Sequence, residues 1–109
     1  MTTLINLTPH SIVIVDEDGH GGTIEPTAPP ARMTVTSVSA GSVAGIPLVR
    51  QEYGEIENLP EPADGVIYIT STMVAQRAQR PDVVSPDTGP TAIRENGQIV
   101  AVRNLQVFA

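Results

Sequence analysis

The sequence predicts an α+β fold, a small and mostly antiparallel twisted β-sheet with one short α-helix. The chain has 109 residues, a length that suits one hydrophobic core, so we expect a single domain over residues 1–109. Hydrophobic residues make up 40% of the chain and aromatic residues 3%, which leaves Val, Ile, Leu and Ala to build a core that favours strands. Short apolar runs broken by Gly and Pro then predict about six strands.

The first elements are two short apolar runs, residues 4–7 and 11–15. Thr8-Pro9-His10 separates them and imposes a bend, because proline fixes φ and lacks an amide donor. We expect these runs to form the first strand pair. Residues 16–22 are acidic and glycine-rich, which is typical of a hairpin turn that leads into a strand at residues 23–25.

A second hairpin follows from the alternation of polar and apolar residues over residues 31–38. Residues 41–45 supply the glycines of a turn, and residues 46–51 form the return strand. Pro47 places that return strand at a sheet edge or makes its start irregular.

The middle of the chain contains an acidic, proline-punctuated segment, residues 53–62, and then an apolar run. The segment predicts a surface loop with Ile56 and Leu59 turned inward. Residues 65–70 show no polar alternation, so they are expected to form the most buried strand of the sheet.

One segment, residues 71–80, has a helical pattern. Ser71 or Thr70 can cap its first amide groups, and Pro81 ends it. The expected inward face comprises Met73, Val74 and Ala78.

The Asn96-Gly97 pair predicts a tight turn between residues 92–94 and a strand at residues 99–108, because these residue types adopt left-handed φ at low cost. The expected buried face of this hairpin comprises Val100, Val102, Leu105 and Val107.

Composition excludes several functions. A net charge of −6 and a pI near 4.6 argue against nucleic-acid binding, which requires clustered cations. The chain has no Cys, and its apolar runs are too short to span a bilayer, so we expect no membrane association and a cytoplasmic location, the host cytoplasm if a phage encodes it. All six basic residues are Arg, which reflects either coding bias or selection for bidentate binding of carboxylates and phosphates.

The first candidate site is the start of the predicted helix, where Thr70, Ser71 and Thr72 are consecutive hydroxyl residues. Free amides and the helix dipole favour a phosphate or carboxylate there. The alternative is that these hydroxyls only cap the helix.

The second candidate site is the proline-stiffened loop at residues 85–94. Thr88, Thr91 and Arg94 could present two hydroxyls and a forked cation to an anionic group, with Asp87 orienting the Arg or accepting from a diol. The alternative is structural: Asp87 makes a local turn with a following amide, and Arg94 pairs with a nearby carboxylate.

Metal and catalytic motifs are weak. His10 and His20 could join the acids at residues 16–18 around a metal ion, but their spacing fits no recognised pattern and a solvated turn explains the acids. No Gly-x-Ser-x-Gly elbow supports a catalytic triad. We therefore predict no metal, no cofactor and no catalytic residue, and a neutral His10 bonded to backbone is the alternative to a ligand role.

Two motifs carry a resemblance to known sequences: Asn6-Leu7-Thr8-Pro9-His10 and the Pro-Asp-Thr-Gly-Pro-Thr-Ala-Ile-Arg run of residues 86–94. With them the chain resembles an uncharacterised family of small hypothetical proteins of actinobacteria and their phages or prophages. The resemblance covers most of the chain, and the family has no assigned activity. It implies a small accessory protein of the phage type.

The leading functional hypothesis is therefore a non-enzymatic binder of an anionic, nucleotide-like small molecule, such as a counter-defence protein that sequesters a host signal. The alternative is a structural or protein–protein interaction module, a virion component or a homo-oligomer. A small hydrolase is third. The predicted ligand-binding residues are His10, Thr70, Ser71, Thr72, Asp87, Thr88, Thr91 and Arg94.

Overall fold

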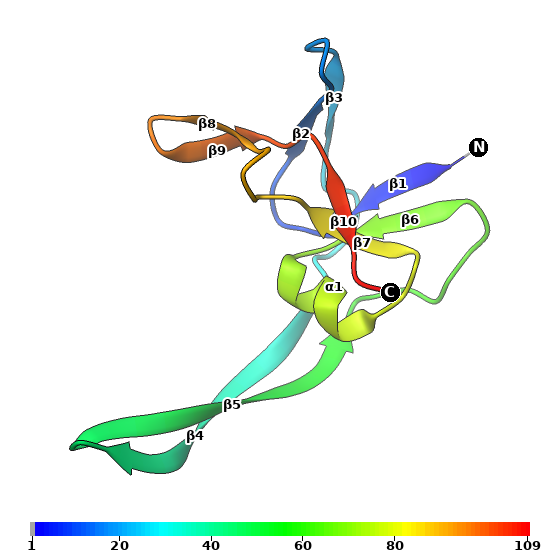
Figure 1. The fold of residues 1–109 in the computed structure, drawn as a ribbon. Helices are drawn as coiled ribbons and strands as arrows, with labels where there is room; N and C mark the ends of the chain where they lie inside the picture. Colours follow the sequence, from blue (N-terminus) through cyan, green and yellow to red (C-terminus); the bar gives the residue numbers. More distant parts are fainter. Residues whose placement is uncertain (1) are drawn as a thin grey trace.

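The computed structural model describes residues 2–109 and is mostly β with one short helix, as the α+β prediction required (Figure 1). The single sheet that we expected is replaced by four small sheets. The elements in chain order are β1 (Thr3–Asn6), β2 (Ile12–Val15), β3 (Gly21–Ile24), β4 (Arg32–Val43), β5 (Ile46–Glu57), β6 (Val66–Ile69), α1 (Thr72–Ala78), β7 (Val83–Pro86), β8 (Ile93–Glu95), β9 (Gln98–Ala101) and β10 (Leu105–Val107).

The central sheet has the strand order β1-β6-β7-β10. β1, β6 and β7 run parallel, and β10 returns antiparallel to β7. Helix α1 supplies the crossover that the parallel β6–β7 connection needs. The predicted pairing of residues 4–7 with 11–15 is wrong, because the chain turns away after β1: β1 pairs with β6, and β2 forms a hairpin with β3.

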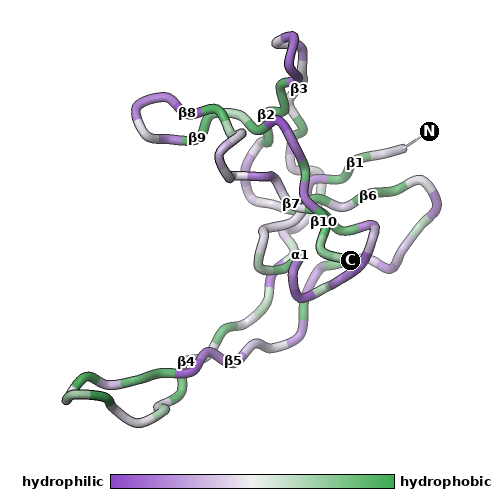
Figure 2. The backbone as a smooth tube through the Cα atoms, viewed as in Figure 1, coloured by the Kyte–Doolittle hydropathy of each residue, from purple (hydrophilic) through white to green (hydrophobic). Residues whose placement is uncertain are grey.

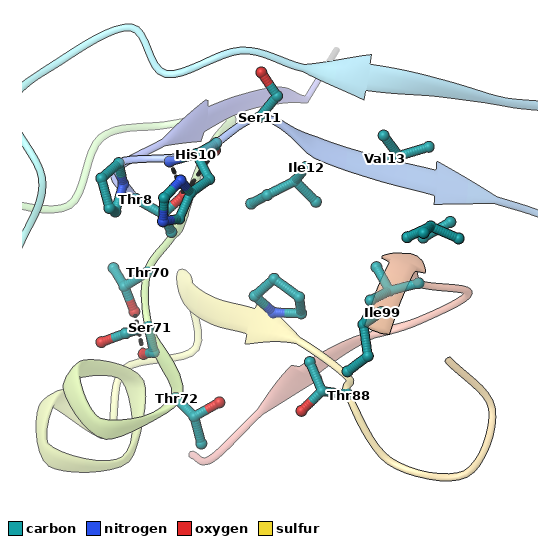
Figure 3. Close-up of a pocket in the computed structure, with 15 residues that line it drawn as sticks. Thr8, His10, Ser11, Ile12, Val13, Thr70, Ser71, Thr72, Thr88 and Ile99 are labelled. Atoms are coloured by element: carbon teal, nitrogen blue, oxygen red, sulfur yellow. Dashed lines mark hydrogen bonds between the residues drawn. The ribbon is translucent and has the colours of Figure 1, made fainter. Parts of the chain in front are cut away.

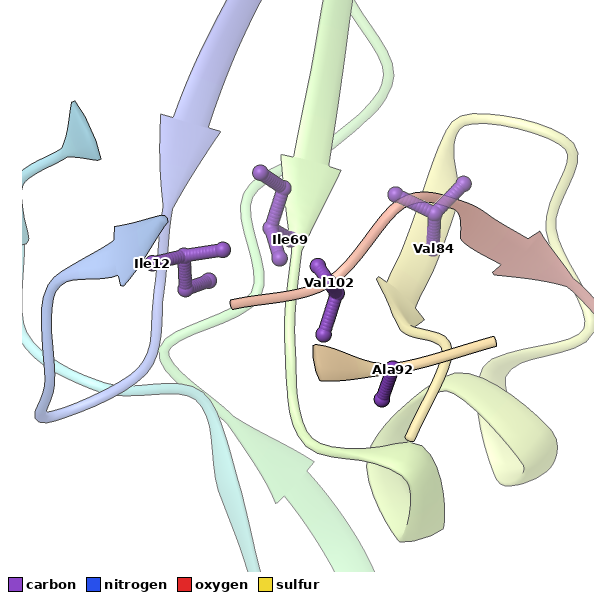
Figure 4. Close-up of a cluster of buried hydrophobic side chains, with 5 residues drawn as sticks. All are labelled: Ile12, Ile69, Val84, Ala92 and Val102. Atoms are coloured by element: carbon purple, nitrogen blue, oxygen red, sulfur yellow. The ribbon is translucent and has the colours of Figure 1, made fainter. Parts of the chain in front are cut away.

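Both faces of this sheet are packed, and β6 is half buried in it. The prediction that β6 is the most buried strand is wrong, because three residues of β7 are buried and only two of β6. Alternate residues of β6 point to opposite faces, so Ile67 and Ile69 contact one cluster and Val66 and Tyr68 contact the other. The first cluster lies between the sheet and the β2–β3 and β8–β9 hairpins, and its buried members are Ile12, Ile69, Val84, Ala92 and Val102 (Figure 4). The buried members of the second cluster are Leu7, Ala31, Tyr68 and Val74.

Helix α1 begins where the sequence predicts but ends at Ala78, before the predicted stop at Pro81. The Ser71 hydroxyl accepts a hydrogen bond from the Val74 amide at 3.4 Å, and Gln79 ends the helix in the left-handed conformation. One part of the predicted inward face is wrong: Met73 is 45% exposed, while Val74 and Ala75 are buried. Within residues 2–109 no helix is long and apolar enough to cross a membrane.

Strands β4 and β5 form a long hairpin, here called the arm (residues 32–57), that projects from the body of the molecule (Figure 1). Its pairing runs from Arg32 opposite Glu57 to Val43 opposite Ile46, and Ala44 and Gly45 make the turn with φ of 51° and 78°. The predicted hairpin is confirmed. The predicted loop at residues 53–62 is wrong for residues 53–57, which belong to β5.

The body anchors the arm at its base. Ile56 and Leu59 pack against the second cluster, as predicted. The Arg77 guanidinium carbon lies 5.0 Å from the ring centroid of Tyr53, which joins β5 to α1 through a cation–π contact.

The C-terminal hairpin is confirmed as well, with Asn96 at φ 53° and Gly97 at φ 80° between β8 and β9. Its second strand is shorter than predicted, because the chain bends after β9 and β10 joins the central sheet. Of its expected buried face, Val102 is buried, whereas Val100 is 42% and Val107 is 52% exposed.

Candidate functional site

An open cavity of about 420 Å³, here called the groove, lies where the bend after β1, strand β2, the start of α1 and strand β9 meet (Figure 3). Backbone hydrogen bonds of 2.9 Å join Val102 to Val13 and to Val15, so the segment after β9 is held beside β2. The lining side chains are mostly apolar, with hydroxyls among them. They are Thr8, Pro9, His10, Ser11, Ile12, Val13, Thr70, Ser71, Thr72, Pro86, Thr88, Ile99, Val100, Ala101 and Val102.

The groove brings together residues from both sites that the sequence suggested. Five of the eight predicted ligand-binding residues line it: His10, Thr70, Ser71, Thr72 and Thr88. The other three, Asp87, Thr91 and Arg94, are not among the lining residues. The two segments that the sequence singled out thus meet at one cavity, and the apolar wall that β2 and β9 contribute was not predicted.

The hydroxyls at the start of α1 are largely used within the protein. Ser71 caps the helix, as the structural alternative proposed. Thr70 is fully buried and its hydroxyl donates to the Ser71 carbonyl at 3.0 Å, while the Thr72 hydroxyl donates to the Ser85 hydroxyl at 3.4 Å. These side chains shape the groove floor and hold α1 against β7.

Arg94 closes its own loop. Its guanidinium donates to the carbonyl of Thr88 at 2.7 Å, of Gly89 at 3.1 Å and of Ala92 at 3.4 Å. The pairing with a carboxylate that the structural alternative described is not seen, since the ion pairs of residues 2–109 are Arg32–Glu57 and Arg80–Asp82. The Arg94 guanidinium thus binds backbone oxygens and stabilises the turn before β8.

Asp87 makes the local turn that the structural alternative described. Its carboxylate accepts from the Gly89 amide at 3.0 Å and from the Thr91 hydroxyl and the Asn104 side-chain amide at 3.4 Å each. The Gly89 amide, with Asn104 and Thr91 after it, lowers the pKa of Asp87 below its ordinary value. Asp87 thereby ties the loop to the segment before β10.

His10 is positioned by a residue that sequence reasoning missed. Asn6 is fully buried and donates to the carbonyls of His10 and Ile24 at 2.8 Å each. Its side-chain oxygen accepts from the Thr8 amide at 2.9 Å and from the Thr8 hydroxyl at 2.7 Å. The signal was present, because an Asn two residues before a Thr-Pro pair suits an Asx-type turn.

The acidic turn between β2 and β3 gathers Asp16, Asp18 and His20, whose ligand atoms lie within 4.8 Å of one another. All three are exposed. The Asp16 carboxylate accepts from the amides of Asp18 at 2.9 Å and His20 at 2.8 Å, which explains the cluster as a solvated turn. His10 lies in the groove and not with this group.

The groove has little charge. His10 is the one ionisable side chain among its lining residues, in a chain with 12 acidic and six basic residues. Such a surface is suited to apolar contacts with hydroxyls at their margin, more than to a multiply charged ligand, which would require cationic donors. No protein-family model matches the chain, and no curated protein or solved structure is significantly similar to it.

Proposed function

We propose that the protein is a non-enzymatic structural module that assembles with further copies of itself by burying its arm. The observation that carries this proposal is the arm: a hairpin of two 12-residue strands that leaves the body and exposes both edges and most of its side chains.

The extent of exposed surface supports assembly. The chain exposes 7250 Å², whereas a folded monomer of its mass exposes about 5,800 Å². Its radius of gyration is 16.6 Å, against about 13 Å for a compact chain of this length. The excess of about 1,450 Å² on one chain exceeds the roughly 800 Å² that each partner contributes to a standard protein–protein interface.

The energetics of an isolated hairpin support it too. A two-stranded hairpin without packing is marginally stable in water, and long unpaired strand edges invite pairing with another chain. Six large hydrophobic side chains of the arm are exposed, and Figure 2 shows that the far end of the arm is predominantly hydrophobic. They are Val35, Val43, Ile46, Leu48, Val49 and Tyr53. Association would bury these side chains and would also stabilise the backbone pairing of β4 with β5.

The test is the molar mass in solution, measured by light scattering after size exclusion over a range of concentrations. We expect a multiple of the 11.5 kDa chain mass. Val43→Ser should weaken association about tenfold, equivalent to about 1.4 kcal/mol, because a contacting Val would lose its apolar burial.

Val107→Ser is the matched control, since Val107 is 52% exposed and Val43 is 55% exposed, but Val107 lies on β10 and outside the arm. It should leave the mass unchanged. A wild-type chain that stays monomeric at high concentration, or equal effects of the two variants, would reject assembly through the arm.

A second candidate, the binding of a nucleotide-like small molecule, is favoured by one observation: five of the residues predicted for it line one cavity. Calorimetry against cyclic dinucleotides and adenosine-diphosphate-ribose derivatives tests it, with His10→Ala and Thr88→Val as groove variants. Absence of heat across that panel would remove this candidate. The hydrolase alternative lacks a comparable observation, because His10 has no acid or base beside it among the groove residues.

A further inference from the structure

We propose that the tip of the arm (residues 43–49) of one copy docks in the groove of a second copy. This inference rests on the proposed function and names the surface that receives the arm. It follows from three properties that the two surfaces share: uncovered apolar side chains, compatible charge and a geometry that excludes docking within one chain.

Apart from the base of the arm, most of the large apolar side chains that the described residues leave exposed lie at the tip or in the groove. Val43, Ile46, Leu48 and Val49 belong to the tip, and Val13, Ile99 and Val100 belong to the groove. The tip is the end of a hairpin with a two-residue turn at Ala44 and Gly45, and the groove is concave with a volume within the range of about 300–1,000 Å³ for sites that enclose a ligand. One contact would therefore cover both surfaces, whereas a contact between two tips would leave the groove open.

Charge allows this contact in a protein whose net charge of −6 otherwise opposes self-association. The arm has no ionisable side chain between Arg32 and Arg50, and the groove lining has none except His10. Two carboxylates flank the groove: Glu25 accepts a hydrogen bond from groove residue Ser11, and Asp87 lies between groove residues Pro86 and Thr88.

Arg50 complements these carboxylates. It is the cation nearest to the tip, it is exposed, and it makes no ion pair with the chain from residue 2 onward. A tip seated in the groove of another copy would bring this cation toward the acidic rim, which favours a second copy as the occupant.

The geometry makes the contact intermolecular. Figure 1 shows that the arm points away from β2 and β9, which form one wall of the groove. A 12-residue strand extends about 40 Å, so the tip reaches beyond its own body. Each copy offers one tip and one groove, and the contact can close reciprocally in a dimer or continue from copy to copy in a ring.

The surface area agrees with two contacts for each chain. A standard interface buries about 800 Å² from each partner, so a tip and a groove would use about 1,600 Å². That amount is close to the excess of the 7250 Å² surface over the expected monomer surface.

Cysteine crosslinking tests the contact directly, because the chain has no Cys and every disulfide would come from the introduced pair. One preparation has Ile46→Cys at the tip and the other has Val100→Cys in the groove. A disulfide requires Cβ atoms within about 4.5 Å, so it reports direct contact. After mixing and mild oxidation we expect the mixed disulfide to exceed either homodimer at least fivefold.

Two matched mixtures complete the design. Ile46→Cys with Val107→Cys places the second thiol on an exposed Val outside the groove and should give little mixed disulfide. Val49→Cys with Val13→Cys is an independent tip–groove pair and should reproduce the main result.

The outcomes separate this inference from the proposed function. If the wild type assembles and Val43→Ser dissociates it, but Ile46→Cys crosslinks chiefly to itself or equally to Val107→Cys, the groove is not the receiving surface and this inference is overturned while assembly stands. If the wild type is monomeric, the proposed function fails and the inference fails with it.

Discussion

Asn6 joins three segments through a single side chain, and it shows what residue-level sequence reasoning can and cannot find. Its amide and oxygen make four hydrogen bonds, to the bend after β1 and to the end of β3. The sequence suggested a bend here, but only the fold reveals that the bend and β3 meet at one buried amide. The same holds for Arg94, whose partners are carbonyls of its own loop and not the carboxylate of the structural alternative.

Replacing Asn6 by Asp should destabilise the fold. The substitution exchanges two donors for a carboxylate that would face the carbonyls of His10 and Ile24, and a buried group without its partner costs about 1–3 kcal/mol. We expect a loss of about 2–4 kcal/mol in the free energy of unfolding, measured by urea denaturation. Asn58→Asp is the control, because the Asn58 side chain is exposed and donates one hydrogen bond, and equal losses for the two variants would contradict the role of Asn6.

Acid should destabilise the protein through two carboxylates. A hydrogen bond from Arg80 lowers the pKa of Asp82, and the amide of Gly89 lowers that of Asp87. Because both pKa values lie lower in the folded state than in the unfolded state, their contribution is complete above about pH 4 and is lost as the pH falls through the folded values. Urea unfolding between pH 7 and pH 2 should show this decline.

Asp82→Asn should flatten that decline, since the Arg80 contacts at 2.6 Å and 2.9 Å lose their charge dependence. Asp64→Asn changes an exposed acid and should leave the profile intact. A wild-type stability that rises on acidification below pH 4 would contradict the sign of both shifts.

At the scale of elements, local chemistry made helix α1 and the hairpin turns predictable. The Ser71 cap and the Asn96-Gly97 turn each depend on a few adjacent residues, and both are present in the structure. The length of the arm was less predictable, because residues 53–57 alternate weakly and their acids resemble those of a loop. These residues form a strand because they pair with β4, and their local sequence does not indicate that partner.

The turn between β8 and β9 should depend on the freedom of Gly97. Its φ of 80° is unfavourable for a residue with a Cβ, so Gly97→Ala should lower the free energy of unfolding by about 1 kcal/mol. Gly22→Ala is the matched control, because Gly22 has no positive φ and an added Cβ would meet open space. Thermal unfolding of both variants tests this. A larger loss of stability for Gly22→Ala than for Gly97→Ala would show that the conformation of the turn does not determine the stability of this hairpin.

At the scale of the whole molecule, strand partners far apart in the chain escaped prediction. β1 pairs with β6 and β10 pairs with β7, and these contacts depend on which apolar faces meet after the helix crosses over. The same limit applies to the groove. The sequence indicated its hydroxyl residues, but β9 lines the groove only because the C-terminal hairpin packs beside β2. Local sequence therefore predicts most of the helices and strands, but few of the strand pairings between distant segments.

The core should fold without the arm. Neither hydrophobic cluster includes a residue from 32 to 55; Ala31 precedes the arm, and Ile56 lies at its base. Replacing residues 34–54 by an Asn-Gly turn should therefore retain cooperative unfolding and shift the midpoint by only a few degrees, as expected when no core contact is removed.

The shortened chain should also lose the extended shape and the capacity to assemble. Small-angle scattering should give a radius of gyration of about 12 Å for 90 residues, whereas a single intact chain has 16.6 Å and an assembly of intact chains would have more. Light scattering should give the mass of a monomer at every concentration, because the tip is absent even though the groove remains. Assembly that persists in this variant would require an interface on the body and would exclude the arm as its cause, while a chain that no longer folds would place the arm in the core.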